Sequence, residues 1–306
     1  MIYTVTLNPA LDYALSAEKI IPGSTNRSHS EYILTGGKGI NVSSMLSKLG
    51  EQSTAFGLIG GFVGDEIEKR TAQTGCMCDF VRINGISRIN VKIKSGLETE
   101  INACGPVISS EELEKLKAKT RKLKSGDTLV LAGSVPKGVP KSIYGDILSE
   151  LPDGVMAIVD ATGELLLDSL RYEPFLIKPN RHELCDIFDT EIENSPEAVS
   201  KYALKLLERG AKNVLVSLAG DGAVLAASDG KCYYSKAPEG KAVDSVGAGD
   251  SMVAGFIHGF LKSGDILKAF AMSVSSGSAS AFSIGFAEKE YVMSFYEDVL
   301  SGLRSL

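Results

Sequence analysis

Short apolar runs alternate with amphipathic stretches along most of the chain. The runs are rich in Val, Ile and Leu with little polar interruption, which is typical of strands buried on both faces. They lie at 1–7, 54–59, 128–132, 156–159, 175–177 and 214–217. Apolar residues at helical spacing stand between them, as at 39–49, 65–74 and 109–123. This alternation predicts an α/β fold with a mostly parallel central sheet covered by helices on both faces.

Two segments break this rhythm and are polar on one face. The first, at 13–34, is loosely β-like. The second alternates over 90–94, has a turn signal at Ser95-Gly96 and alternates back over 98–102, which predicts a hairpin. We expect the two segments, at about 10–35 and 86–105, to form a small β-sheet lid inserted in a single domain of residues 1–306. Because so small a sheet buries little surface, it needs a partner, and a homodimer formed through the lid is expected.

Composition and charge narrow the class of protein. The 306 residues are 44% hydrophobic, as in ordinary globular proteins, and carry a net charge of −6, which argues against nucleic acid as a partner. No apolar run is long enough to span a membrane, and the first residues have no signal-peptide character. Five scattered cysteines indicate reduced thiols and a cytoplasmic location.

The most informative motif is Gly247-Ala248-Gly249-Asp250, which opens an apolar helical stretch at 248–261. Glycines let the backbone turn so that N–H groups point outward together at a helix N-terminus, where an anion is favoured. A carboxylate at this point is placed to accept a proton from a hydroxyl, while the same N–H groups stabilise a transferring phosphoryl group. A glycine-rich turn followed by an acid also occurs without function in many folds.

A second glycine-rich segment, Gly36-Gly37-Lys38-Gly39, leads into the helical stretch at 39–49. It is not a P-loop, because Lys38 is followed by glycine instead of Ser or Thr. Its glycines permit close approach of a ligand, and the amide of Asn41 is suited to sugar hydroxyls. Asp12 follows the first strand, at the sheet edge where ligands bind in such folds, although an Asp there is more often a turn former.

Four motifs in order carry a family resemblance over essentially the whole chain. They lie at 36–42, 178–183, 217–222 and 244–251. With them the chain resembles the phosphofructokinase B group of ribokinase-like carbohydrate kinases. The segments at 6–12, 87–92 and 247–253 are most similar to the bacterial 1-phosphofructokinase branch, and the tagatose-6-phosphate kinase branch shares most of them. The resemblance implies a ribokinase-like three-layer domain with a lid, a phosphosugar substrate, and ATP and Mg²⁺ as cofactors.

The resemblance also implies roles for individual residues. Asp250 would be the catalytic base, and the N–H groups of Gly247, Ala248 and Gly249 would form the anion hole. Substrate-binding positions would be Asp12, Arg27, Gly37, Lys38, Asn41, Arg88 and Ser134, with the basic residues serving the substrate's own phosphate. Nucleotide-binding positions would be Lys178, Asn180, Ser217, Gly220 and Gly222. Glu183 would contact Mg²⁺ through water.

Each of these assignments has a simpler alternative. Arg27 and Arg88 are also compatible with an ordinary lid surface, and Glu183 with a first-turn helix acid. The expected reaction is phosphorylation of fructose 1-phosphate at C6, with tagatose-6-phosphate kinase as the nearer alternative. A non-catalytic sugar-phosphate or nucleotide-binding regulator is disfavoured, because it has no need of the base in the Gly247–Asp250 motif.

Overall fold

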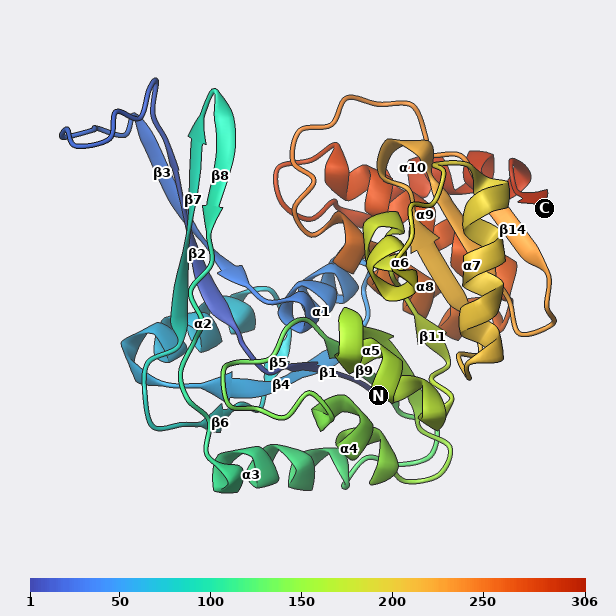
Figure 1. Cartoon of the computed structure of the whole chain (residues 1–306), viewed down its shortest axis with the longest axis horizontal. Helices are drawn as coiled ribbons and strands as arrows, with labels where there is room; N and C mark the ends of the chain where they lie inside the picture. The colour runs from blue at the N-terminus through green and yellow to red at the C-terminus, as the bar shows by residue number, and fades with distance from the viewer.

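The computed structural model describes residues 1–306, apart from the side chains of Leu97 and Glu98. A large sheet crosses the main body, helices cover both of its faces, and a second, smaller sheet rises from one side (Figure 1). The termini lie at the main body, away from the tip of the smaller sheet (Figure 1).

The large sheet has 11 strands in the order β15-β14-β13-β12-β11-β10-β9-β1-β4-β5, with β6 also paired to β4. Its parallel part comprises β1 (Ile2–Thr6), β4 (Ser53–Ile59), β5 (Met77–Cys78), β6 (Val81–Arg82), β9 (Thr128–Ala132), β10 (Met156–Asp160), β11 (Leu176–Ile177) and β12 (Val214–Ser217). An antiparallel edge follows, made of β13 (Ala223–Ala226), β14 (Cys232–Ser235) and β15 (Arg304–Ser305). The prediction of a mostly parallel sheet is confirmed, while the antiparallel edge was not predicted.

Helices pack on the two faces of this sheet in separate layers. One face carries α3 (Ser110–Thr120), α4 (Ile143–Ser149), α5 (Gly163–Ser169), α6 (Arg181–Phe188) and α7 (Pro196–Glu208). The other carries α1 (Lys38–Lys48), α8 (Ala248–Ser263), α9 (Ile266–Ala281) and α10 (Lys289–Ser301). The remaining helix, α2 (Gly61–Gln73), packs its Val63 and Ile67 on β4 at the base of the smaller sheet.

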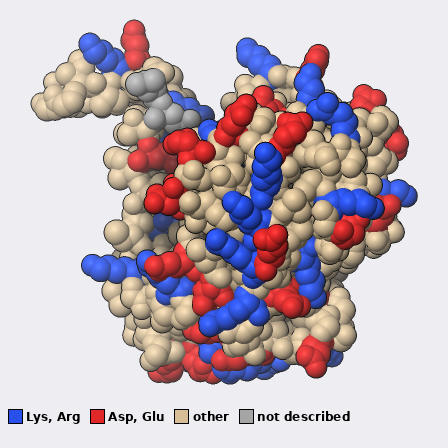
Figure 2. Space-filling view, turned by 45° about the vertical axis from the view of Figure 1, so that its right-hand side comes forward, with Lys and Arg blue, Asp and Glu red and all other residues tan. Residues whose placement is uncertain are grey.

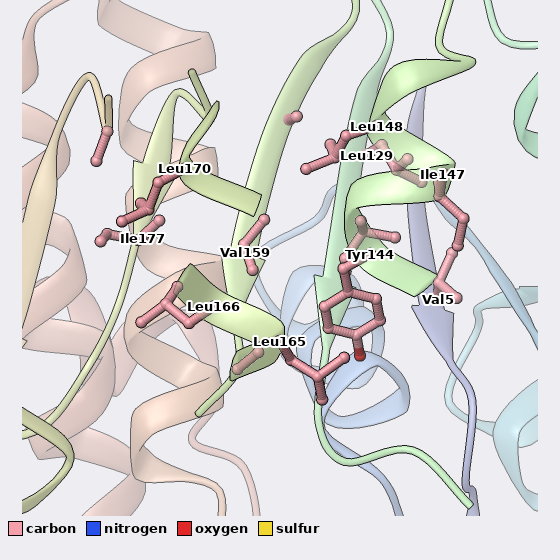
Figure 3. Packing of buried hydrophobic residues seen from close by; sticks show 14 of the residues in the cluster. Val5, Leu129, Tyr144, Ile147, Leu148, Val159, Leu165, Leu166, Leu170 and Ile177 are labelled. Carbon is pink, nitrogen blue, oxygen red and sulfur yellow. The ribbon is translucent and has the colours of Figure 1, made fainter. Parts of the chain in front are cut away.

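Alternation along the strands supplies both cores at once. In β9, Leu129 packs into the cluster on the α3–α7 face and Val130 into the cluster on the α1–α10 face. Figure 3 shows Leu129 and Val159 of adjacent strands directed toward the same layer as Tyr144 of α4. Because both faces are covered, the strands read as continuous apolar runs in the sequence.

The two segments that were predicted to form a lid make up the smaller sheet. It has four strands in the order β3-β2-β7-β8. These are β2 (Ala10–Ser16), β3 (Ser30–Gly36), β7 (Arg88–Ser95) and β8 (Leu97–Ile101). The hairpin between β7 and β8 turns at Gly96, whose φ of +70° suits glycine. The predicted hairpin and its pairing with the first lid segment are confirmed.

Charged side chains of both signs are interspersed over the main body in the face that Figure 2 shows, so they offset one another locally. None of the described helices combines the length and the apolarity that crossing a membrane requires.

Candidate active site

The α8 helix begins at a glycine that provides no side-chain cap. Gly247 is the N-cap residue, with a φ of +78° in the left-handed region, and it has no side chain to cap the helix. The Ala248 N–H donates to the Ser245 carbonyl at 3.2 Å. Among the described residues, the N–H groups of Gly247 and Gly249 have no hydrogen-bond partner. Two of the three N–H groups predicted for the anion hole are therefore available to a ligand.

Asp250 lies in the first turn of α8 and is only 6% exposed. Its Oδ2 accepts a hydrogen bond of 2.7 Å from Asn41 Nδ2, which comes from the first turn of α1. Burial and the nearby Asp160 carboxylate raise the pKa of Asp250 to about 6, against the effects of Lys38, Asn41 and Lys178. The structure thus joins two predicted site residues that are 209 positions apart in the chain.

A buried ion cluster lies beside Asp250. Asp160, the last residue of β10, is fully buried, and its Oδ1 lies 2.8 Å from Lys38 Nζ while its Oδ2 lies 3.3 Å from Lys178 Nζ. Burial disfavours the charge of Asp160, but Lys178 and Lys38 outweigh burial and hold its pKa below the usual range. Burial likewise opposes the charge of Lys38, but Asp160 and Asp250 raise its pKa above the usual value. Asp160 and Lys38 are therefore both charged at neutral pH.

Asp160 is the residue of this cluster that sequence reasoning missed. The available signal was its place directly after the apolar run at 156–159, at the carboxyl edge where ligands bind in parallel sheets. Lys178 was predicted to meet nucleotide phosphates, and its ammonium lies close beneath the start of α8: a Cβ on Gly249 would be 3.1 Å from Lys178 Nζ.

On the lid side, Asp12 of β2 is the centre of a polar group. Its Oδ1 accepts a hydrogen bond of 2.8 Å from Asn90 Nδ2, and its Oδ2 lies 3.5 Å from Lys92 Nζ. A small recess forms where this face of the lid meets the loop before α8, lined by Asp12, Ala14, Tyr32, Leu34, Lys92, Lys94, Asp244 and Val246. Lys92 was not predicted as a site residue, although it shares a strand face with Asn90.

The other predicted substrate positions have different local surroundings, and none of them lines this recess. Gly37 has a φ of +127°, and a Cβ there would meet Thr6 Cγ2 at 2.6 Å, so the turn into α1 requires glycine. Ser134 follows Gly133, whose N–H donates to the Asp160 carbonyl, and so belongs to the same sheet edge. Arg88 donates to the backbone carbonyls of Asn8 and Ala103, at 3.0 and 3.1 Å. Arg27 is exposed in the loop between β2 and β3 and has no polar partner among the described residues.

A cavity of about 650 Å³ opens on the opposite side of the α8 start. Four of the five predicted nucleotide positions line it, namely Asn180, Ser217, Gly220 and Gly222. Ala248 and Gly249 of the α8 start also line the cavity, and Met252, Val274 and Phe282 form apolar parts of its wall. Its size and mixed lining are those of a small-molecule or cofactor site. Lys178, the fifth predicted position, is buried below it in the ion cluster.

Glu183 has a structural role that is visible directly. Its Oε2 accepts the N–H of Asn180 at 2.8 Å, while its own N–H donates to Asn180 Oδ1, so the two residues form a capping box at the start of α6. Within the described part of the chain, no cluster of three or more His, Cys, Asp or Glu side chains could hold a metal by itself. A Mg²⁺ ion at this site would therefore take most of its ligands from nucleotide phosphates and water.

The chain is similar to known proteins over nearly its whole length. Residues 6–290 match the family described as pfkB family carbohydrate kinase. The chain is 43% identical to a 1-phosphofructokinase of Bacillus subtilis, over 98% of both chains, and 38% identical to a D-tagatose-1-phosphate kinase of Bacillus licheniformis, over 94% and 95%. The phosphofructokinase-2 of Escherichia coli, solved with substrates and products, superposes with a TM-score of 0.90 at 29% identity, over 97% of this chain and 99% of that one. The chain therefore belongs to the pfkB family of carbohydrate kinases.

Proposed function

We propose that this kinase transfers the γ-phosphoryl group of ATP to the C6 hydroxyl of fructose 1-phosphate, giving fructose 1,6-bisphosphate and ADP. One observation carries the proposal: the loop of residues 244–249 borders both the cavity and the recess under the lid, and the Asp250 carboxylate stands at its end. A nucleotide in the cavity and a sugar in the recess would meet at Asp250. The choice of sugar rests on the 43% identity to a 1-phosphofructokinase.

The chemistry assigned to the chain is proton transfer and charge stabilisation. As the C6 oxygen attacks the γ-phosphorus, its proton passes to Asp250, and the bond from the γ-phosphorus to the β,γ-bridging oxygen breaks. A pKa of about 6 leaves Asp250 ionised at neutral pH yet more basic than an ordinary aspartate. Asn41 holds the carboxylate in place, and the free N–H groups of Gly247 and Gly249 face the charge of the transferring group.

The substrate would be held from the lid and from the start of α1. Asp12, Gly37 and Asn41 are assigned to the sugar hydroxyls, and Ser134 to the rim of the same site. Lys38, Arg27 and Arg88 are assigned to the substrate's phosphate, and the position of Lys92 beside Asp12 adds a fourth cation. Since Arg88 now donates to backbone carbonyls, binding of a phosphate there involves an exchange of hydrogen bonds.

The nucleotide would occupy the cavity beside Asn180, Ser217, Gly220 and Gly222, with Lys178 under its phosphates. Mg²⁺ bound with the nucleotide supplies positive charge that offsets the phosphate oxygens during transfer. Glu183, whose carboxylate is held by its capping box, is assigned to contact that ion through water.

A homodimer through the lid is part of the proposal. Ile33, Tyr13, Val91 and Ile101 are direct cross-strand neighbours on one face of the lid, opposite the face that carries Asp12. Ile33 is 36% and Ile101 is 57% exposed, so this face offers apolar surface to a second copy of the chain. Replacing Ile101 by Glu is expected to yield monomers in analytical ultracentrifugation, whereas an unchanged mass would exclude this face as the interface.

The substrate assignment is tested by coupled ADP release with ATP-Mg²⁺. We would compare kcat/KM for fructose 1-phosphate, tagatose 1-phosphate, tagatose 6-phosphate and fructose 6-phosphate. Tagatose 1-phosphate is the sharpest competitor, because a relative at 38% identity is a D-tagatose-1-phosphate kinase and the two sugars differ only in configuration at C4. A preference for fructose 1-phosphate supports the proposal, and a preference for either tagatose phosphate replaces its substrate. ATP binding without turnover of any phosphosugar would favour a regulator.

A further inference from the structure

The buried carboxylate of Asp160 has no part in the mechanism described so far. A carboxylate removed from water is strongly destabilising unless charged partners compensate it. Asp160 meets this requirement with two lysines from different segments, Lys38 at the start of α1 and Lys178 just after β11. Its Oδ2 has no well-aligned hydrogen bond among the described residues. Lys178 is therefore held mainly by charge attraction, since its Nζ lies 3.3 Å from Asp160 Oδ2.

The cluster sits directly under the reacting groups. Lys178 Nζ lies close beneath Gly249, and Lys38 leads the helix that supplies Asn41, the hydrogen-bond partner of Asp250. The charged groups that act on Asp250 are Asp160, Lys38 and Lys178. From α9, which packs against α8, the Ser280 hydroxyl forms a hydrogen bond with the Ser251 hydroxyl. Glu183 of α6 acts on Lys38 from the nucleotide side.

We propose that Asp160 is a positioning residue of phosphoryl transfer, which clamps the ammonium groups of Lys38 and Lys178 side by side beneath the anion-binding start of α8. This inference rests on the proposed function, because it concerns the same site. Without Asp160, two neighbouring ammonium groups would repel each other and lose their fixed positions. With Asp160 in place, both ammonium groups stay available to phosphate oxygens. The negative charge of Asp160 also reduces the net positive charge of the cluster by one.

The clamp also controls how good a base Asp250 is. Asp160 is the one negative charge among the three ionised groups that act on Asp250, and the two lysines favour the Asp250 carboxylate. Removing Asp160 leaves the lysines unopposed, so the pKa of Asp250 falls and the carboxylate becomes a weaker proton acceptor. A residue that only filled space would change the amount of folded protein and would not move this pKa.

The test is the isosteric replacement Asp160→Asn, measured as kcat/KM against pH with ATP-Mg²⁺ and the best phosphosugar. In the wild-type enzyme the acid limb should lie near pH 6, the pKa of Asp250. In the variant we expect kcat to fall by about 10²-fold and the acid limb to move by roughly one pH unit toward acid. The matched control is Asp127→Asn, since Asp127 is also buried and paired, with the N-terminal ammonium at 2.9 Å, but lies at the amino end of β9. This control should lose stability and keep the acid limb in place.

A second comparison separates a clamp from a general loss of folding. Lys38→Met and Asp160→Asn are combined, and if Asp160 acts through Lys38 the double variant should lose much less kcat than the product of the two single losses. The same cycle is measured by thermal unfolding, where Lys38→Met should recover part of the stability that Asp160→Asn removes. Strictly multiplicative kcat losses, or an acid limb that stays in place in Asp160→Asn, would overturn the clamp.

The outcome is separable from that of the proposed function. Failure of the wild type to use fructose 1-phosphate rejects the substrate assignment, and the clamp is then judged with whichever phosphosugar the wild type phosphorylates. Wild-type turnover of fructose 1-phosphate together with a near-normal Asp160→Asn enzyme rejects the clamp alone.

Discussion

Two consecutive helices of equal length, α8 and α9, pack against each other and begin in opposite ways. In α9 the Asp265 side chain caps the helix and accepts the N–H groups of Leu267 and Lys268, at 2.8 and 3.2 Å. In α8 the capping position is Gly247, which offers no side chain and leaves N–H groups free. The N–H groups at the start of α9 therefore have a hydrogen-bond acceptor within the protein, whereas those at the start of α8 are available to a ligand.

The same contrast holds for the carboxylates at the two helix starts, the N-cap Asp265 of α9 and the first-turn Asp250 of α8. Asp265 stabilises its helix, whereas Asp250 is buried and its pKa is raised from 3.8 to about 6. Since the folded protein binds this proton more tightly than the unfolded chain does, Asp250 lowers stability as the pH rises from about 4 through 6. The start of α8 is thus an example of a site where function is maintained at a cost in stability.

The largest expected effect comes from Asp250→Asn. Loss of the proton acceptor should lower kcat by about 10²- to 10⁴-fold while KM for both substrates changes little. The variant should also unfold at a higher temperature than the wild type above pH 6, because a neutral amide replaces a carboxylate that burial disfavours. Steady-state kinetics and thermal unfolding at pH 5 and pH 8 check both statements. Near-normal turnover would remove Asp250 from the role of base.

Sequence reasoning found the α8 start because its chemistry is local. The glycines, the acid and the helix they open are neighbours in the chain, and the lid is equally visible from strict alternation over 90–102. Asn41 was predicted to bind sugar hydroxyls, and its hydrogen bond to Asp250 emerges only from the packing of α1 against α8.

The ion cluster was not predictable in the same way. Asp160 is separated by 122 residues from Lys38, so no spacing rule joins them. Its two partners had each been assigned another role, Lys38 at the substrate's phosphate and Lys178 at the nucleotide. A single acid after a strand is most simply a turn residue. The antiparallel edge of the sheet was missed for a related reason: the apolar runs of β12 and β13 look alike, and strand direction is set by the connection, not by the run.

A smaller effect is expected from Gly247→Ala, because it changes the geometry of the α8 start without removing the base. The new Cβ would meet the Phe286 ring at 2.8 Å, and the φ of +78° disfavours alanine. Displacement of the free N–H groups should lower kcat/KM by about 10²-fold.

The matched control is Gly264→Ala at the other end of α8, where φ is +65° and no atom lies within 4 Å of the new Cβ. It should lower the free energy of unfolding by about 1 kcal/mol and leave kcat/KM unchanged. Equal kinetic losses in the two variants would show that helix stability, and not the position of the N–H groups, limits turnover.

The smallest effect should come from Asp265→Ala, which removes the cap of α9. Leaving the N–H groups of Leu267 and Lys268 to water is expected to lower the free energy of unfolding by about 1 kcal/mol, with kcat/KM unchanged. Asp265→Asn should recover most of this stability, since an Asn side chain caps equally well. Denaturant unfolding and the coupled assay measure the two quantities on the same preparations. A loss of kcat/KM in Asp265→Ala that Asp265→Asn restores would mean that the cap of α9 also fixes the start of α8 through their shared packing, and the two helix starts would then not be independent.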